Sequence, residues 1–177
     1  MSNSSKQTQL LLKGLSSSKP EKVIESIEKC RKDGDIITLN AILENLKNTD
    51  EPDVEAAIIS FLYDLKNQEC TPILIEHLKD QDLKYYQNFL VATFWQSSLD
   101  GSAYLKEFVD VAIEGDYMTA VEALTVIENF EHSFPEIELM DAEAALNEAL
   151  EKEKDENKKT LFESMINVLR NLPIEGE

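Results

Sequence analysis

The feature that most constrains the fold is an apolar triplet with helical spacing that recurs along the chain. Each copy has apolar residues at positions i, i+3 and i+4, which lie on one face of an α-helix. The copies are Val54-Ala57-Ile58, Tyr86-Phe89-Leu90, Ala120-Ala123-Leu124 and Phe162-Met165-Ile166. Successive copies begin 32, 34 and 42 residues apart. A period of this length is typical of helical repeats, so the sequence predicts an array of helices rather than a globular bundle.

Turn and capping residues divide the chain into helices around these copies. The five glycines and five prolines fall almost entirely between helical patterns, which favours an all-α chain. Aspartates at positions 35, 82 and 116 each precede an apolar stripe, and we expect them to cap the helices that follow. The predicted helices include residues 19–32, 54–65, 71–79, 82–97, 103–114, 116–130, 136–154 and 158–172.

The domain organisation follows from the same pattern. Residues 1–18 are rich in serine and other polar groups, and we expect a flexible N-terminal segment there, in which the leucines form at most a short helix or docking turn. Residues 19–173 should form a single domain, with 174–177 as a tail. A length of 177 residues suits one domain with a sizeable core.

The chain is strongly acidic and the charge is unevenly placed. The net charge of −18 comes almost wholly from residues 51–177, because residues 1–50 carry 8 basic and 7 acidic side chains. Such a surface repels phosphate backbones, so we expect no nucleic-acid binding. It would attract a basic protein partner. The alternative is that the charge serves solubility alone.

Other sequence signals exclude several classes of protein. Cys30 and Cys70 belong to no CxxC pair and are expected to be reduced thiols of a cytoplasmic protein. Neither a secretion signal nor a membrane-spanning segment is expected. His77 and His132 lie outside any zinc-binding spacing, and no calcium, phosphate-binding or nucleophile-elbow motif occurs. We therefore expect a protein without metal or cofactor that is not an enzyme.

Three segments carry a resemblance to a known repeat family. They are AILENLKNTDEPDVEAAIISFL, ILIEHLKDQDLKYYQNFLVATF and FVDVAIEGDYMTAVEALTVI, and each joins an A-type helix to a B-type helix across a short turn containing aspartate. Over about residues 36–172 the chain resembles HEAT or armadillo-like repeats. The resemblance implies a right-handed α-solenoid of about four to five helical hairpins that acts as a scaffold, adaptor or assembly factor. The enzymes of this shape, such as its DNA glycosylases, need a basic groove where this chain is acidic.

A candidate partner-binding patch follows if the B-type helices line the concave side. With Val54 at the origin and 100° per residue, Tyr63 lies opposite the buried stripe, and the repeat offset relates it to Trp95 and Asn129. The patch is Ile59, Tyr63, Val91 and Trp95, bordered by Glu55, Lys84, Gln87, Asn88, Glu122 and Asn129. Aromatic side chains with amide neighbours are typical of protein recognition. The alternative is that Trp95 packs under Leu99 and completes the core.

A second candidate site is an acidic face. It comprises Asp110, Glu114, Asp116, Glu122, Glu128 and Glu131, which could bind a basic peptide. The alternative is an ordinary solvated helix surface.

These observations favour a non-catalytic protein-binding module that uses Trp95 and Tyr63 as apolar anchors. Two other hypotheses remain open. An enzyme or enzyme subunit would need carboxylates that converge in a groove shielded from water. A nucleic-acid mimic would need carboxylates at regular spacing along one face. The partner, the process and the oligomeric state do not follow from the sequence.

Overall fold

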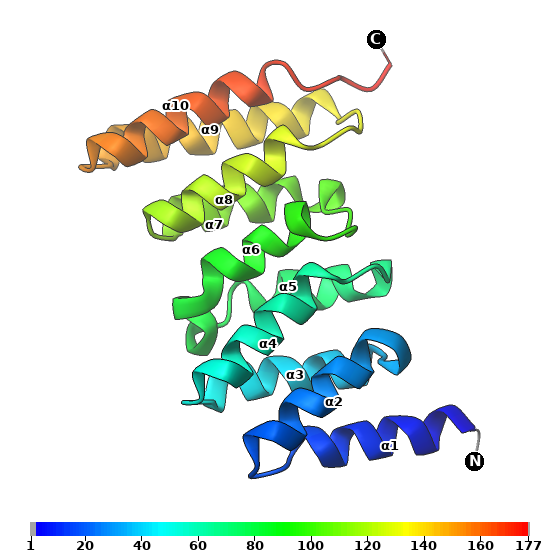
Figure 1. Ribbon diagram of the computed structural model, residues 1–177. Coiled ribbons are helices and arrows are strands. Elements are labelled where there is room, and N and C mark those ends of the chain that lie inside the picture. Colours follow the sequence, from blue (N-terminus) through cyan, green and yellow to red (C-terminus); the bar gives the residue numbers. More distant parts are fainter. Residues whose placement is uncertain (1–2, 177) are drawn as a thin grey trace. The chain divides into compact units, whose positions relative to one another are not determined.

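The chain is helical throughout the range that the computed structural model describes, residues 3–176 (Figure 1). Within this range the regular structure consists of ten α-helices, α1–α10, and three short 3-10 helices, η1–η3. An isolated bridge between Phe134 and Ile174 is the one β-type pairing there. The prediction of an all-α chain is confirmed. Among these helices, none has the length and apolar character needed to cross a membrane.

The chain divides into two compact units. The first unit is Met1–Leu83 together with Gln96–Leu99, and the second is Lys84–Trp95 together with Asp100–Glu177. The chain passes between them three times: within η2 (Gln81–Tyr86), at the end of α6 (Gln87–Gln96), and between Leu99 and Asp100.

The first unit is built from helices that pack on both their sequence neighbour and the next but one. It holds α1 (Asn3–Leu15), α2 (Pro20–Asp33), α3 (Ile36–Asn48), α4 (Pro52–Tyr63), η1 (Gln68–Cys70) and α5 (Thr71–His77). Helix α1 packs on α2 and α3, α2 packs on α4, and α3 packs on α4. Ile27, Ile42 and Ile58 are fully buried between them.

Helix α1 corrects the prediction of a flexible segment over residues 1–18. Leu11 and Leu15 are four residues apart, so they share one face of the helix, and both are buried. Gly14 allows α2 to come close, because a Cβ at this position would lie 1.9 Å from the Ser26 hydroxyl oxygen. The polar composition of the segment concealed this narrow apolar stripe.

Asp35 begins α3, as predicted, and also ties it to α1. One carboxylate oxygen accepts a hydrogen bond from the Thr38 backbone N–H at 3.0 Å, and the other accepts one from the Thr8 hydroxyl at 2.7 Å. The Thr38 hydroxyl bonds back to the Asp35 N–H, which completes a capping box.

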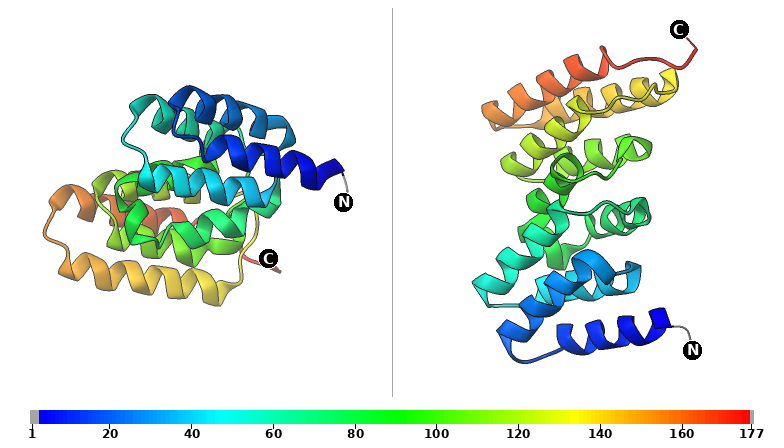
Figure 2. Two further views of the ribbon diagram at one scale, coloured as in Figure 1. Left: turned by 90° about the horizontal axis from the view of Figure 1, so that it is seen from below. Right: turned by 45° about the vertical axis from the view of Figure 1, so that its right-hand side comes forward.

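The second unit repeats the packing pattern of the first. It holds most of α6, then η3 (Ser102–Tyr104), α7 (Leu105–Glu114), α8 (Tyr117–Glu128), α9 (Glu136–Lys152) and α10 (Glu156–Leu169). Helix α7 packs on α8 and α9, α8 packs on α10, and α9 and α10 run side by side (Figures 1 and 2). Asp116 caps α8 by accepting the Thr119 N–H at 2.8 Å, as predicted.

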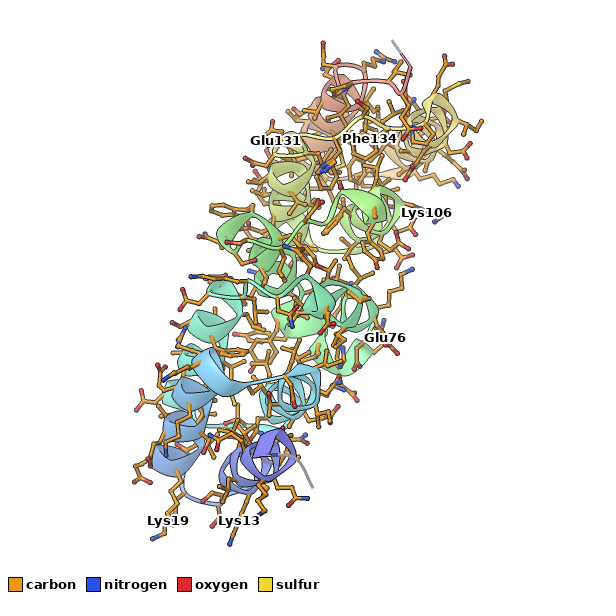
Figure 3. All side chains as sticks on the ribbon, turned by 90° about the vertical axis from the view of Figure 1, so that its right-hand side faces the viewer. Lys13, Lys19, Glu76, Lys106, Glu131 and Phe134 are labelled. Carbon is orange, nitrogen blue, oxygen red and sulfur yellow. The ribbon has the colours of Figure 1, made fainter. Side chains whose placement is uncertain are left out.

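Contacts between aromatic rings, and backbone hydrogen bonds to the C-terminal segment, hold the loops of the second unit in place. Phe108 lies edge-on to Phe94 at 4.9 Å and to Phe130 at 6.0 Å between ring centroids. Phe134, labelled in Figure 3, packs against Phe130 and exchanges backbone hydrogen bonds with Pro173 and Glu175, both 2.9 Å long. The predicted tail is thus paired through Glu175 to the loop before α9.

One predicted helix is divided. Residues 82–97 form the 3-10 helix η2 and then α6, which begins only at Gln87. Asp82 does not cap a helix, and its N–H instead bonds to the Asp80 carboxylate at 3.0 Å. Because a 3-10 helix turns 120° per residue, the faces of residues 81–86 do not follow the 100° pattern used for the sequence.

Candidate functional site

Trp95 is the most distinctive exposed side chain among the predicted site residues. It lies near the end of α6 and is 40% exposed. Its indole N–H donates a hydrogen bond of 2.7 Å to the Glu122 carboxylate on α8. The structure therefore brings together two residues that are 27 positions apart and that the sequence assigned to the same patch. The alternative that Trp95 completes the core does not fit this exposure.

Local sequence explains why Trp95 is the residue that emerges. The preceding turn of α6 is buried on every side, with Val91, Ala92 and Thr93 each below 5% exposure, and Phe94 stacks edge-on to Phe108. Trp95 lies at the point where this buried helix reaches the surface. Its hydrogen bond to Glu122 fixes the ring, so the exposed face has a defined orientation.

Two members of the predicted patch are buried, and their assignment to it was wrong. Val91 is fully buried, and Gln87 is also buried, where its side-chain oxygen accepts a hydrogen bond from the Lys84 ammonium at 3.0 Å. The physical reason is that α6 is enclosed on more than the one face that the helical wheel assigned to the core. Neither side chain is available to a partner.

The remaining patch residues are divided between the two units. Ile59 and Tyr63 lie on α4 in the first unit and are half-buried, as is Glu55. Asn88 in the second unit is half-buried, and Asn129 is exposed with its amide donating to the Thr125 carbonyl at 2.7 Å. Within the second unit, the patch is therefore defined by Trp95 and Glu122.

The predicted acidic face is partly engaged in holding the fold. Asp110 pairs with Lys106 at 2.6 Å. The Thr119 N–H lowers the pKa of Asp116 against the opposing effect of burial, which marks this carboxylate as a helix cap. Glu114 is exposed, but its backbone carbonyl accepts from Lys84 at 3.2 Å. Glu128 and Glu131 are exposed, and Figure 3 labels the latter in the loop after α8.

Lys158 is a buried residue for which no functional or structural role was predicted. Its ammonium donates to the Ile113 and Gly115 carbonyls, both at 2.8 Å, and lies 3.5 Å from Glu153. These carbonyls form the C-terminal end of α7, where a positive charge is favourable. The position of Lys158 could have indicated this role. The helix dipole disfavours a positive charge in the first turn of α10 unless nearby acceptors compensate it.

Both cysteines line one cavity of about 420 Å³ in the first unit. Cys30 and Cys70 are both buried, and burial, with a smaller effect of Glu69, raises the pKa of Cys70. A raised pKa keeps this thiol protonated, which makes it a poor nucleophile. Arg31 also lines this cavity. Its guanidinium donates hydrogen bonds to the Ser60 backbone and hydroxyl oxygens, which joins α2 to α4.

Among the side chains that the structure describes, no group of three or more histidine, cysteine, aspartate or glutamate residues is placed to hold a metal ion. Comparisons of the chain with protein-family models, curated proteins and solved structures gave no match. The function must accordingly be inferred from the geometry of the chain itself.

Proposed function

We propose that this chain is a non-catalytic protein-binding module that recognises its partner through Trp95. The observation that carries the proposal is the indole ring, which is 40% exposed yet held by a 2.7 Å hydrogen bond to Glu122. Tryptophan is enriched among the residues that dominate binding energy at protein interfaces. A ring that is already oriented loses little side-chain entropy when it binds.

We also propose that the helices form a HEAT-like right-handed solenoid that presents this residue. The support is the packing within each unit, where two successive hairpins contact each other through like helices: α1 with α3 and α2 with α4, then α7 with α9 and α8 with α10. Stacking of this kind is what helical repeats use to bury a continuous core. Trp95 and Glu122 lie on α6 and α8, which are B-type helices in this scheme.

The test is affinity capture from native cell extract followed by calorimetry with each purified captured protein. Truncating a central tryptophan costs about 2 kcal/mol or more, so Trp95→Ala should weaken binding by about thirtyfold. Glu122→Ala, which frees the ring without removing it, should weaken binding less. The matched control is Tyr117→Ala, since Tyr117 is 43% exposed in the same unit and is not predicted to contact the partner.

Two results decide the question. A captured protein that binds the wild type and the Tyr117→Ala variant equally but loses affinity for Trp95→Ala supports the proposal. If every captured protein binds Trp95→Ala as tightly as the wild type at high salt, Trp95 is not the recognition residue and the proposal fails. Circular dichroism of each variant confirms that the fold is retained.

A further inference from the structure

A second cavity, of about 370 Å³, opens between α7 and α9 in the second unit. Its floor comprises Val109 on α7 with Ala142 and Ala145 on α9. The two alanines are three residues apart, so they lie on the same face of α9 and leave space where larger side chains would fill it. This cavity is on different helices from Trp95 and Glu122, which lie on α6 and α8.

The apolar surface continues beyond the mouth of the cavity. Ile137 lines it and is 64% exposed, and Met140, one turn further along α9, is 59% exposed. Large aliphatic side chains this exposed on one helix face form a surface whose burial is favourable. Because the apolar strip extends along α9, it suits an extended occupant better than a compact small molecule.

The charges around the cavity are almost all negative. Asp110, Glu138 and Asp141 line it, and the one cation in the lining, Lys106, is already paired with Asp110 at 2.6 Å. The Lys106 side chain extends outward from the helices (Figure 3). Within the described part of the chain, no ion pair is formed by Glu138 or Asp141.

Glu138 is in an environment that disfavours its charge. Its burial, reinforced by the nearby carboxylates of Glu107 and Glu175, raises its pKa. A cation brought to this position would reduce the repulsion and return the carboxylate to a favourable environment. The cavity is thus complementary in charge to a basic group and complementary in polarity to an apolar one.

We propose that the cavity between α7 and α9 binds a basic peptide segment of a partner protein. An aliphatic or aromatic side chain of the segment enters the space above Ala142 and Ala145, and flanking lysine or arginine side chains pair with Glu138 and Asp141. Ile137 and Met140 cover the apolar face of the segment as it continues along α9. This surface is independent of Trp95, so either site can fail without the other.

The experiment measures fluorescence anisotropy of a labelled amphipathic peptide, LKKLLKLLKKLLKL, with the full chain at physiological salt. The comparison peptide replaces each leucine with alanine, so its charge is the same. Removing the apolar anchor forfeits at least two buried methylene groups, which corresponds to a loss of about tenfold in affinity. Equal binding of the two peptides would overturn the proposal, because it would reduce the interaction to the general acidity of the chain.

Variants of the protein locate the binding. Ala145→Trp fills the cavity without changing charge and should lower the affinity about tenfold, and Ile137→Ser, at an exposed position, should lower it severalfold. Glu138→Gln should also lower it severalfold, whereas Glu151→Gln, on the same helix away from the cavity, should leave it within about twofold. If Ile137→Ser and Glu138→Gln bind the leucine peptide like Glu151→Gln, the cavity is not the site. Trp95→Ala is expected to bind this peptide like the wild type.

Discussion

Replacing Lys158 with methionine should destabilise the second unit, because two backbone carbonyl oxygens lose their hydrogen-bond donor. Methionine retains most of the aliphatic stem of lysine but not the ammonium, which also lies over the Phe162 ring, 5.4 Å from its centroid. What is lost is the ammonium that donates to Ile113 and Gly115, both at 2.8 Å. The end of α7 then has acceptors that face the interior without a donor.

The size of the effect follows from how enclosed each acceptor is. A buried acceptor left without a partner costs about 1–3 kcal/mol. The bond to Gly115 is buried and the bond to Ile113 is partly buried, so water can replace the second more easily than the first. Loss of the favourable charge at the helix end adds about 0.5 kcal/mol. We therefore expect Lys158→Met to lower the free energy of unfolding by about 2–3 kcal/mol.

Urea unfolding followed by tryptophan fluorescence measures this directly. Trp95 is the single tryptophan and belongs to the same unit as Lys158. With a slope of about 2 kcal/mol per molar urea, the midpoint should fall by roughly 1–1.5 M. Lys159→Met is the matched control, because the Lys159 ammonium pairs with Glu156 on its own helix, 2.7 Å away. A midpoint for Lys158→Met equal to that of Lys159→Met would refute the assigned role of the ammonium.

Three further predictions concern pH, charge and the orientation of Trp95. Burial alone would raise the pKa of Asp35, but the hydrogen bonds from Thr38 and Thr8 outweigh it and lower the pKa. Asp35→Ala should therefore cost about 1–2 kcal/mol at neutral pH, and the difference in urea midpoint from the wild type should shrink as the pH falls below about 4. The pKa of Glu138 is shifted in the opposite direction, upward, so its negative charge lowers the free energy of unfolding above about pH 4.3. Glu138→Gln should thus raise the thermal midpoint at pH 7 and leave it unchanged at pH 3. Glu122→Ala should weaken the near-ultraviolet circular dichroism of Trp95, since the carboxylate that fixes the indole is gone.

The helices were predictable because their buried faces repeat at helical spacing. Val54 and Ile58, and likewise Met165 and Ile166, are buried at the positions that the recurring triplet assigned to the core. The caps at Asp35 and Asp116 were also predictable from a short acidic side chain before an apolar stripe, but at Asp82 the same pattern lies within a 3-10 helix and gives no cap. The division into two units was not predictable, because the apolar stripes continue without a break across the residues where it falls.

The candidate sites were predictable only where a residue's exposure follows from its own helix. Trp95 and Glu122 are hydrogen-bonded, and the sequence could assign them to one patch because a single offset relates the exposed faces of the two helices that carry them. The prediction that Val91 is exposed was wrong, because its burial depends on the segments that cover the second face of α6. The local sequence of α6 contains no information about them. The cavity between α7 and α9 also escaped prediction, since it arises where the alanines of one helix meet another helix, and alanine by itself indicates only a good helix former.

The acidity of the chain is not one property, and the structure separates two kinds of carboxylate in the second unit. At the end of α7 the negative groups are compensated internally, because Lys84 and Lys158 bond to the helix carbonyls. The pKa of Asp116 is lowered mainly by the hydrogen bond from the Thr119 N–H and further by the charges of these two lysines. Across the cavity on α9 the corresponding compensation is missing, and the pKa of Glu138 is raised. Solubility needs exposed charge, but it does not need a carboxylate that is partly buried beside an apolar space. The basic segment proposed for the cavity would supply the cation that Glu138 lacks within the second unit.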